Sequence, residues 1–277
     1  MNVAILRKKG CSLETCRGII GHLAQMGRVV KLYKSDQSNN GTEILIRWGS
    51  TARFMHNFCI NTPEMIHLAS NKIETRRRLI AAGISTPRTF FTREDAALRA
   101  TIGQYPIIGR KRHHAQGREM RISRNIDELR NDNRSEYWSE FIPKDREYRV
   151  YVFFGRLLAV SEKIPVDKSK VAWNKSLNNG AFVNLHMCDV PRPVGYLAIQ
   201  AANELGVDFS AVDIVSKGNQ NYVLEFNNTP DSSPYRQLLW ARAFNWLIGK
   251  IEETGTKPER FKLGRNEQGK MRLLCRN

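Results

Sequence analysis

The chain has 277 residues, a length that suits one globular unit with two or three subdomains. Its apolar content of 41% can form a core, but the apolar runs are broken by charge well short of the roughly 18 residues of a membrane span. The N-terminus lacks the charge order of a secretory signal, so we expect a cytoplasmic protein with no membrane partner.

The first 62 residues alternate between strand-like and helix-like segments. Three segments have the composition of strands: residues 2–6, 29–33 and 43–48. A helical pattern begins at Ser12 and ends at Gly27. Such alternation is typical of a mainly parallel, doubly wound sheet. We therefore predict a small N-terminal α/β domain over residues 1–62.

A boundary at residues 61–63 (Asn-Thr-Pro) separates this domain from the rest. One long helix is expected over residues 64–82, ending at Gly83. Further helical patterns cover residues 126–131, 194–205 and 238–251. Strand-like segments cover residues 105–111, 137–160, 211–215 and 222–226, and the last two form a predicted hairpin. We predict a central subdomain over residues 63–138, a C-terminal subdomain over 139–255 and a basic tail over 256–277.

Two carboxylates and an amide stand on the predicted hairpin. Asp213 lies inside one apolar strand and Glu225 inside the other, and Asn227 shares the face of Glu225 because it is two residues away. Three such oxygen donors match the preference of Mg²⁺, with phosphate oxygens completing the octahedron. The alternative is that all three are solvent-facing residues of an exposed hairpin.

The same hairpin resembles the metal-binding end of the ATP-grasp superfamily, in the branch with glutathione synthetase and the glutamate ligase of a ribosomal protein's tail. Residues 211–214 (Ala-Val-Asp-Ile) and 224–230 (Leu-Glu-Phe-Asn-Asn-Thr-Pro) carry it. The resemblance extends over roughly residues 61–250 and implies the ATP-grasp fold, of class α/β (α+β). In that fold a small N-terminal α/β domain precedes two α+β subdomains that sandwich ATP. Where the family has Gly after this turn, the chain has residues 231–233 (Asp-Ser-Ser).

The resemblance implies a phosphate-binding set upstream of the hairpin. Lys72 is expected near the nucleotide phosphates, although a plain helix-surface lysine is the other interpretation. Arg110 or Lys111 is expected along the phosphates, and the sequence does not choose between them. A loop over the β- and γ-phosphates would include His113, His114, Gln116 and Gly117, which alternatively form a solvated basic loop.

The resemblance also implies an adenine and ribose site. Backbone groups at Glu140 and Ile142, with Phe141 between them, would hold adenine, and Glu147 would bind the ribose hydroxyls. Arg149 and Lys163 are the expected catalytic cations, with Lys163 at the γ-phosphate or acyl-phosphate oxygens. Taken alone, this alternation of charged and apolar residues also fits a half-exposed sheet.

The implied activity is an ATP- and Mg²⁺-dependent carboxylate–amine ligase that forms an acyl phosphate and adds an amino acid to a peptide, protein or small molecule. Two Mg²⁺ ions are expected, with Mn²⁺ as an alternative metal. The net charge of +17 favours an anionic or acidic substrate. It also leaves open a nucleic-acid-binding protein on a degenerate ATP-grasp scaffold, and the fold equally allows a kinase.

Overall fold

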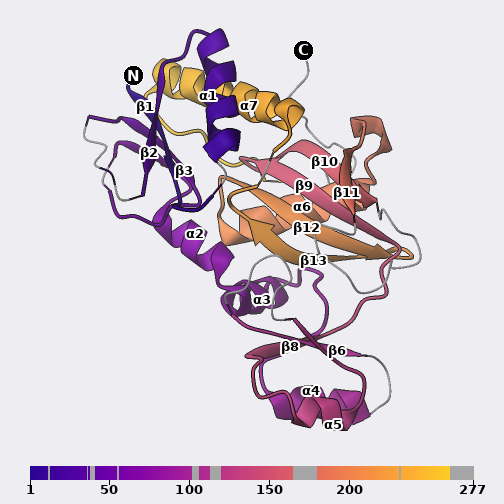
Figure 1. The fold of residues 1–277 in the computed structure, drawn as a ribbon. Coiled ribbons are helices and arrows are strands. Elements are labelled where there is room, and N and C mark those ends of the chain that lie inside the picture. The colour runs from indigo at the N-terminus through magenta and orange to yellow at the C-terminus, as the bar shows by residue number, and fades with distance from the viewer. Residues whose placement is uncertain are drawn as a thin grey trace.

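The structure, a computed structural model, describes residues 1–11, 13–35, 37, 41–54, 56–101, 106–112, 120–164, 180–230 and 232–262. Within them the chain forms three sheets. They follow one another along the molecule, from the N-terminal unit through the five-stranded sheet to a small unit at the opposite end (Figure 1). Among the helices of these residues, none combines the length and apolar composition that a membrane crossing requires.

The N-terminal sheet is parallel throughout, with strand order β2-β1-β3-β4. Its elements are β1 (Val3–Arg7), α1 (Leu13–Gln25), β2 (Val30–Lys34), β3 (Ile44–Trp48) and β4 (Phe58–Ile60). The predicted parallel α/β unit is therefore confirmed. The sequence analysis missed β4, a strand of three residues.

The second sheet is antiparallel, with order β5-β8-β6-β7, and forms the small unit together with two helices (Figure 1). Its elements are β5 (Thr89–Phe90), α4 (Arg93–Thr101), β6 (Ile107–Arg110), β7 (Arg121–Ser123), α5 (Ile126–Arg130) and β8 (Tyr137–Glu140). The predicted boundary between residues 138 and 139 falls inside β8. The division into subdomains otherwise stays a prediction.

The single helix predicted over residues 64–82 is wrong, because the chain forms α2 (Pro63–Ser70) and α3 (Lys72–Ala81). Asn71 separates them with extended backbone angles, φ −83° and ψ 97°. Its side-chain oxygen accepts a hydrogen bond from Glu74 N at 3.3 Å and so caps α3. This cap starts a new helix at Lys72.

The third sheet has five antiparallel strands in the order β11-β10-β9-β12-β13. Its elements are β9 (Arg146–Phe153), β10 (Arg156–Ile164), β11 (Ala181–Asn184), the 3₁₀ helix η3 (Met187–Asp189), α6 (Arg192–Leu205), β12 (Phe209–Lys217), β13 (Gln220–Asn227) and α7 (Pro234–Thr254). The predicted hairpin is confirmed as β12–β13. Residues 263–277 of the predicted tail lie outside the described residues.

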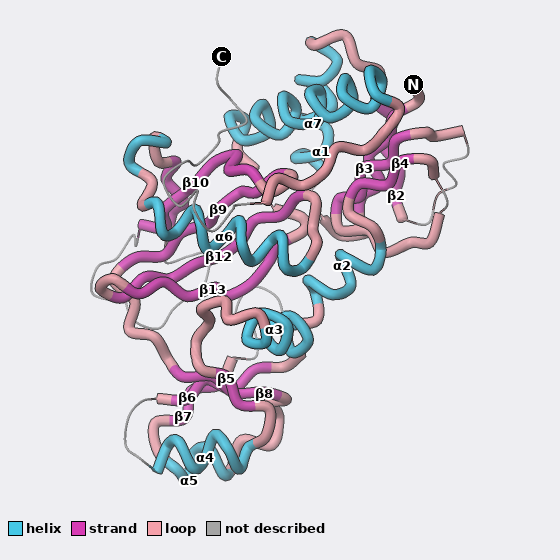
Figure 2. The backbone as a smooth tube through the Cα atoms, turned by 180° about the vertical axis from the view of Figure 1, so that it is seen from behind, coloured by secondary structure: helices cyan, strands magenta, loops and turns pink. Residues whose placement is uncertain are grey.

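The two faces of the five-stranded sheet differ. One face is apolar and packs under α6, with Val150, Val212 and Ile214 in its core (Figure 2). The other face is apolar at one end only, where Phe153 and Phe209 pack against α7 and the N-terminal unit. The remaining end of this face carries the polar side chains that the resemblance singles out.

A buried network joins the predicted boundary at residue 61 to the five-stranded sheet. Asn61, fully buried at φ 57°, accepts a hydrogen bond from Asp208 N at 2.7 Å and donates its own N–H to Asp208 Oδ2 at 2.8 Å. Lys257 and Arg260 bind the same buried carboxylate at 2.6 and 3.1 Å. The network therefore ties three distant segments together.

Replacing Asn61 will test this network. Asn61→Ala should lower the free energy of unfolding by about 2–4 kcal/mol. The substitution removes buried side-chain hydrogen bonds, and alanine tolerates a positive φ less well than asparagine does. Asn61→Gly should recover about 1 kcal/mol of that loss because glycine tolerates this backbone angle. Urea unfolding measures both values. Asn133→Ala, at an exposed asparagine, is the control, and equal effects at the two positions would contradict the prediction.

The thiol of Cys16 in α1 predicts a pH effect on stability. Burial raises the pKa of Cys16 from 9.0 to about 12, although the charge of Arg7 opposes the rise. Above pH 9 the unfolded chain loses this proton while the folded chain keeps it, so the thiol favours unfolding as the pH rises from 9 towards 12. The stability of the wild type relative to Cys16→Ala should therefore fall between pH 8 and pH 11 in urea titrations. A difference that does not change with pH would refute this expectation.

Candidate functional site

One row of polar side chains crosses all five strands of the third sheet. Glu225 on β13 pairs with Asp213 on β12, which pairs with Arg149 on β9. Arg149 in turn pairs with Ser161 on β10, which pairs with Asn184 on β11. Directly opposite residues in a sheet point to the same face. The five side chains therefore lie side by side on the open end of the polar face.

The centre of the row is an ion pair between Arg149 and Asp213. Arg149 Nε and NH2 donate to the two Asp213 carboxylate oxygens at 2.7 and 2.8 Å, a bidentate geometry. Asp213 is 3% exposed. Burial acts to lower the pKa of Arg149, but the charge of Asp213 and the hydrogen bonds to it outweigh burial and raise that pKa above the ordinary value for arginine.

Glu225 and Asn227 lie beside this pair on β13. Lys72 Nζ is 3.6 Å from Glu225 Oε2 and donates to the Phe226 carbonyl at 3.4 Å. Asn227 Oδ1 accepts a hydrogen bond from Thr229 N at 2.9 Å, which fixes the turn after the strand. Asp213, Glu225 and Asn227 lie on the paired strands β12 and β13, and carboxylate and amide oxygens are the kind of donor that suits Mg²⁺. The described residues contain no cluster of three His, Cys, Asp or Glu side chains suited to a metal.

A buried arginine holds α3, and with it Lys72, against β13. Arg76 NH1 and NH2 donate to the carbonyls of Val223 and Leu224 at 2.6 and 2.7 Å. Burial lowers the pKa of Arg76 to about 10, so the guanidinium is still charged at neutral pH. These bonds place the beginning of α3 over the acidic end of the row.

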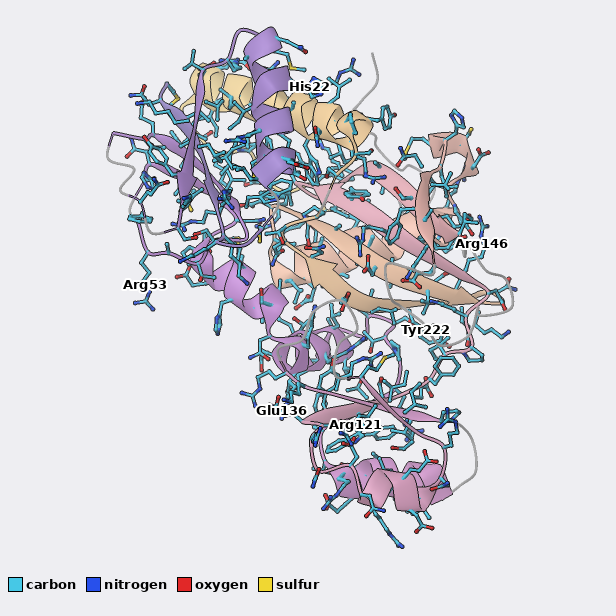
Figure 3. The ribbon with its side chains drawn as sticks, in the orientation of Figure 1. His22, Arg53, Arg121, Glu136, Arg146 and Tyr222 are labelled. Carbon is cyan, nitrogen blue, oxygen red and sulfur yellow. The ribbon has the colours of Figure 1, made fainter. Side chains whose placement is uncertain are left out.

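Glu147 on β9 lies near two lysines, Lys144 in the loop before this strand and Lys163 on β10. Lys144 Nζ donates to Glu147 Oε2, and Lys163 Nζ is 3.9 Å from Glu147 Oε1. Burial lowers the pKa of the Lys163 ammonium, although the charge of Glu147 opposes this shift. Arg146, the first residue of β9 and labelled in Figure 3, instead forms a bidentate pair with Glu162. The structure therefore brings Glu147 and Lys163 together, as a ribose and phosphate role for them would require.

A pocket lies between the second and third sheets, and four predicted residues line it. Two of its lining residues are hydrogen-bonded to each other, since Arg110 NH1 donates to Ser139 Oγ at 2.7 Å. The lining residues are Pro87, Ile108, Arg110, Met120, Ser139, Glu140, Phe141, Ile142, Lys144, Val215 and Leu224. Lys111 is not among them, which favours Arg110 of the two predicted cations. Gln116 and Gly117, like His113 and His114, lie outside the described residues.

Comparison with known proteins decides the family. A family model described as the RimK-like ATP-grasp domain matches residues 69–239, which include the whole polar row. The chain belongs to the RimK-like ATP-grasp family. This membership confirms the predicted superfamily and the predicted fold.

Relatives of this RimK-like protein are named as ligases. A coenzyme γ-F420-2:α-L-glutamate ligase from Methanococcus maripaludis is 22% identical over 65% of this chain, and the match spans 66% of that relative's length. A probable α-L-glutamate ligase from an Enterobacter species (strain 638) is 22% identical over 95% of this chain and 100% of its own. These names support the predicted enzyme class, ATP-dependent carboxylate–amine ligation.

A solved structure agrees with the fold. The ATP-grasp ligase PsnB complexed with a minimal precursor has a TM-score of 0.65 at 12% identity, and the match covers 89% of this chain and 98% of PsnB. PsnB has also been solved with the precursor, Mg and ADP, at a TM-score of 0.62 and 11% identity over 86% and 93% of the two chains. The predicted cofactors ATP and Mg²⁺ agree with the family; the number of ions and the Mn²⁺ alternative stay predictions.

Three residues of the site were missed by the sequence analysis: Ser161, Asn184 and Arg236. Ser161 and Asn184 complete the row, and Arg236 in α7 donates to both, at 3.2 and 2.8 Å. Their position depends on the pairing of β10 with β11 and on where α7 crosses the sheet. No motif marks either feature, although Ser161 is only two residues before Lys163.

The ion pair in the centre of the row generates a stability prediction. Arg149→Met should lower the free energy of unfolding by about 3–5 kcal/mol, because it leaves the buried Asp213 carboxylate without its counter-charge. The double variant Arg149→Met/Asp213→Asn should recover much of this loss. Urea unfolding without metal measures both. Arg146→Met, in the more exposed pair with Glu162, should cost at most about 1 kcal/mol; equal costs at 146 and 149 would disprove the account.

Proposed function

We propose that this RimK-like protein is an ATP- and Mg²⁺-dependent ligase that joins an amino acid to the carboxylate of a peptide, protein or small molecule. The observation that carries the proposal is the polar row, in which Asp213, Glu225 and Arg149 lie side by side. The same sheet also contributes Val215 and Leu224 to the lining of the pocket. The basic net charge of the chain further favours an anionic substrate.

The pocket between the second and third sheets is the proposed adenine site. Ile108 and Leu224 are among its apolar lining residues, and residues 140–142 also line it. Glu147 would accept hydrogen bonds from the ribose hydroxyls. Arg110 lines the pocket and Lys72 lies 3.6 Å from Glu225, and both would neutralise phosphate oxygens. Catalysis of phosphoryl transfer consists largely of such alignment and charge neutralisation.

Asp213, Glu225 and Asn227 would hold magnesium, which supplies positive charge at the β- and γ-phosphate oxygens. The bidentate contact with Arg149 leaves lone pairs on both Asp213 oxygens, since an ionised carboxylate has about four acceptor positions. The Asn227 amide oxygen likewise has a second lone pair beside its bond from Thr229. The donors are thus oriented by the protein and still able to bind.

The proposed reaction has two steps. A substrate carboxylate oxygen attacks the γ-phosphorus of ATP, so that an acyl phosphate and ADP form. The amine of the second substrate then attacks the acyl carbon, the carbon–oxygen bond to phosphate breaks, and inorganic phosphate leaves. Lys163 and Arg149 would neutralise the oxygens that gain charge in both steps.

The relatives guide the choice of substrate. Two of them are named as α-L-glutamate ligases, and PsnB was solved with a precursor peptide. L-Glutamate as the amine and an acidic peptide or cofactor as the carboxylate are therefore the first pair to test. A kinase that stops after phosphoryl transfer would release ADP without a new C–N bond. The ligase relatives give no support to the nucleic-acid-binding alternative.

The first experiment is calorimetry of ATP binding with and without Mg²⁺. The wild type should bind ATP more tightly with Mg²⁺, and Glu225→Gln should lose most of that increase, because it removes a charged metal ligand. Its rate of ATP consumption with an accepted substrate pair should fall by about 10²–10³-fold.

Glu253→Gln is the matched control, because it makes the same substitution at an exposed carboxylate of α7 that pairs with Lys250. It should leave ATP affinity unchanged. If the wild type binds no ATP with or without Mg²⁺, the proposed function is wrong.

A further inference from the structure

The end of the polar row away from Glu225 carries an arginine that belongs to no strand. Arg236 lies in the first turn of α7, and its NH1 donates to Asn184 Oδ1 at 2.8 Å and to Ser161 Oγ at 3.2 Å. Ser161 Oγ also donates to Asn184 Oδ1 at 2.9 Å. We call these three residues the Arg236 subsite. The subsite is built by strands β10 and β11 and by helix α7 from the C-terminal part of the chain.

The guanidinium of Arg236 has donors that the described residues do not use. Among the described residues no ion pair includes Arg236, and its buried Nε has no hydrogen-bond partner. It lies 5.6 Å from the Tyr151 ring centroid, which supports its plane. By contrast, Arg149, Lys72 and Lys163 each lie near a carboxylate. A half-buried arginine with an orphaned buried N–H is suited to an incoming anion.

The Arg236 subsite lies at the right distance from the proposed reaction centre. Ser161 is the direct neighbour of Arg149 in the sheet register. Adjacent strands are about 4.8 Å apart, so the subsite is about 5–10 Å from Arg149 along the row. This span matches a small amino acid whose amine is at the reacting carbon and whose carboxylate points away along the sheet.

Resting on the proposed ligase function, we propose that Arg236 is a specificity residue that binds the free α-carboxylate of the amino acid substrate. The planar guanidinium fork matches a carboxylate, and Ser161 and Asn184 hold the fork in place through NH1. An amino acid whose α-carboxylate is converted to an amide lacks the negative charge and leaves Arg236 unpaired. The subsite therefore selects free amino acids over peptides extended at that carboxylate.

The test compares two probes on the full chain saturated with Mg²⁺ and ADP. Calorimetry measures the affinity for L-glutamate and for its α-amide, which differ only at the group in question. The wild type should bind L-glutamate about 10–100-fold more tightly than the amide. Arg236→Gln should weaken L-glutamate binding by a similar factor and leave amide binding nearly unchanged, while Arg236→Lys should restore part of the preference.

A second variant keeps Arg236 but gives it a carboxylate partner within the protein, so that it can no longer bind the substrate carboxylate as well. Asn184→Asp places a carboxylate where the amide oxygen lies 2.8 Å from Arg236 NH1, so Arg236 gains an internal counter-charge. The preference for L-glutamate over its amide should fall as in Arg236→Gln, with ADP affinity and thermal stability retained. Arg242→Gln, at an exposed arginine of the same helix, is the matched control and should behave as the wild type.

The outcomes separate this proposal from the proposed function. If Mg²⁺-dependent ADP binding is normal but Arg236→Gln and Asn184→Asp keep the full preference for L-glutamate, the subsite assignment is wrong and the ligase function stands. The same holds if the wild type binds nucleotide but shows no preference for a free α-carboxylate with any of the standard L-amino acids. Failure of the wild type to bind nucleotide would overturn both.

Discussion

The buried carboxylate of Asp213 is the constraint around which the site is built. A charge that is 3% exposed must be compensated, because removing an ion from water costs several kcal/mol even after relaxation. Arg149 supplies this compensation from the adjacent strand with two hydrogen bonds. That pairing fixes both side chains in one geometry, so the acidic end of the row is oriented before any ligand binds. Preorganised charge of this kind is what electrostatic catalysis requires.

The position of the row depends on the apolar face beneath it. Side chains alternate between the faces of a strand, so a shift by one residue would exchange the core residues Val150 and Val212 for Arg149 and Asp213. Packing under α6 therefore sets the register of β9 and β12, and with it the alignment of the charged residues. Arg76 extends the same frame to α3 through the carbonyls of β13. The polar site is thus held in place by residues outside the polar row.

The sequence predicted the parts of the site that are local. Asp213, Glu225 and Asn227 are found because hairpin strands have a period of two, and residues 140–142 because one contiguous segment carries the resemblance to the family. The break at Asn71 was missed because helical periodicity continues across it, and only the cap to Glu74 shows where a new helix begins. Ser161, Asn184 and Arg236 meet through non-local pairing of β10, β11 and α7, and one chain contains no signal for that pairing. That Arg110 lines the pocket likewise depends on the packing of the second sheet against the third, and which of Arg110 and Lys111 contacts phosphate stays a prediction.

The distribution of charge explains how so basic a protein can have a specific nucleotide site. Three cations of the site, Arg149, Lys72 and Lys163, lie close to the carboxylates Asp213, Glu225 and Glu147. Their charges are largely balanced in the free protein, so little of the net charge of +17 belongs to them. On binding, the phosphates of the nucleotide would take the place of the carboxylates as partners of these cations, and the metal ion would take the place of the cations as partner of the carboxylates. Under the proposed function, the excess basic charge would attract an anionic substrate through its long-range field, and screening by salt would weaken that attraction.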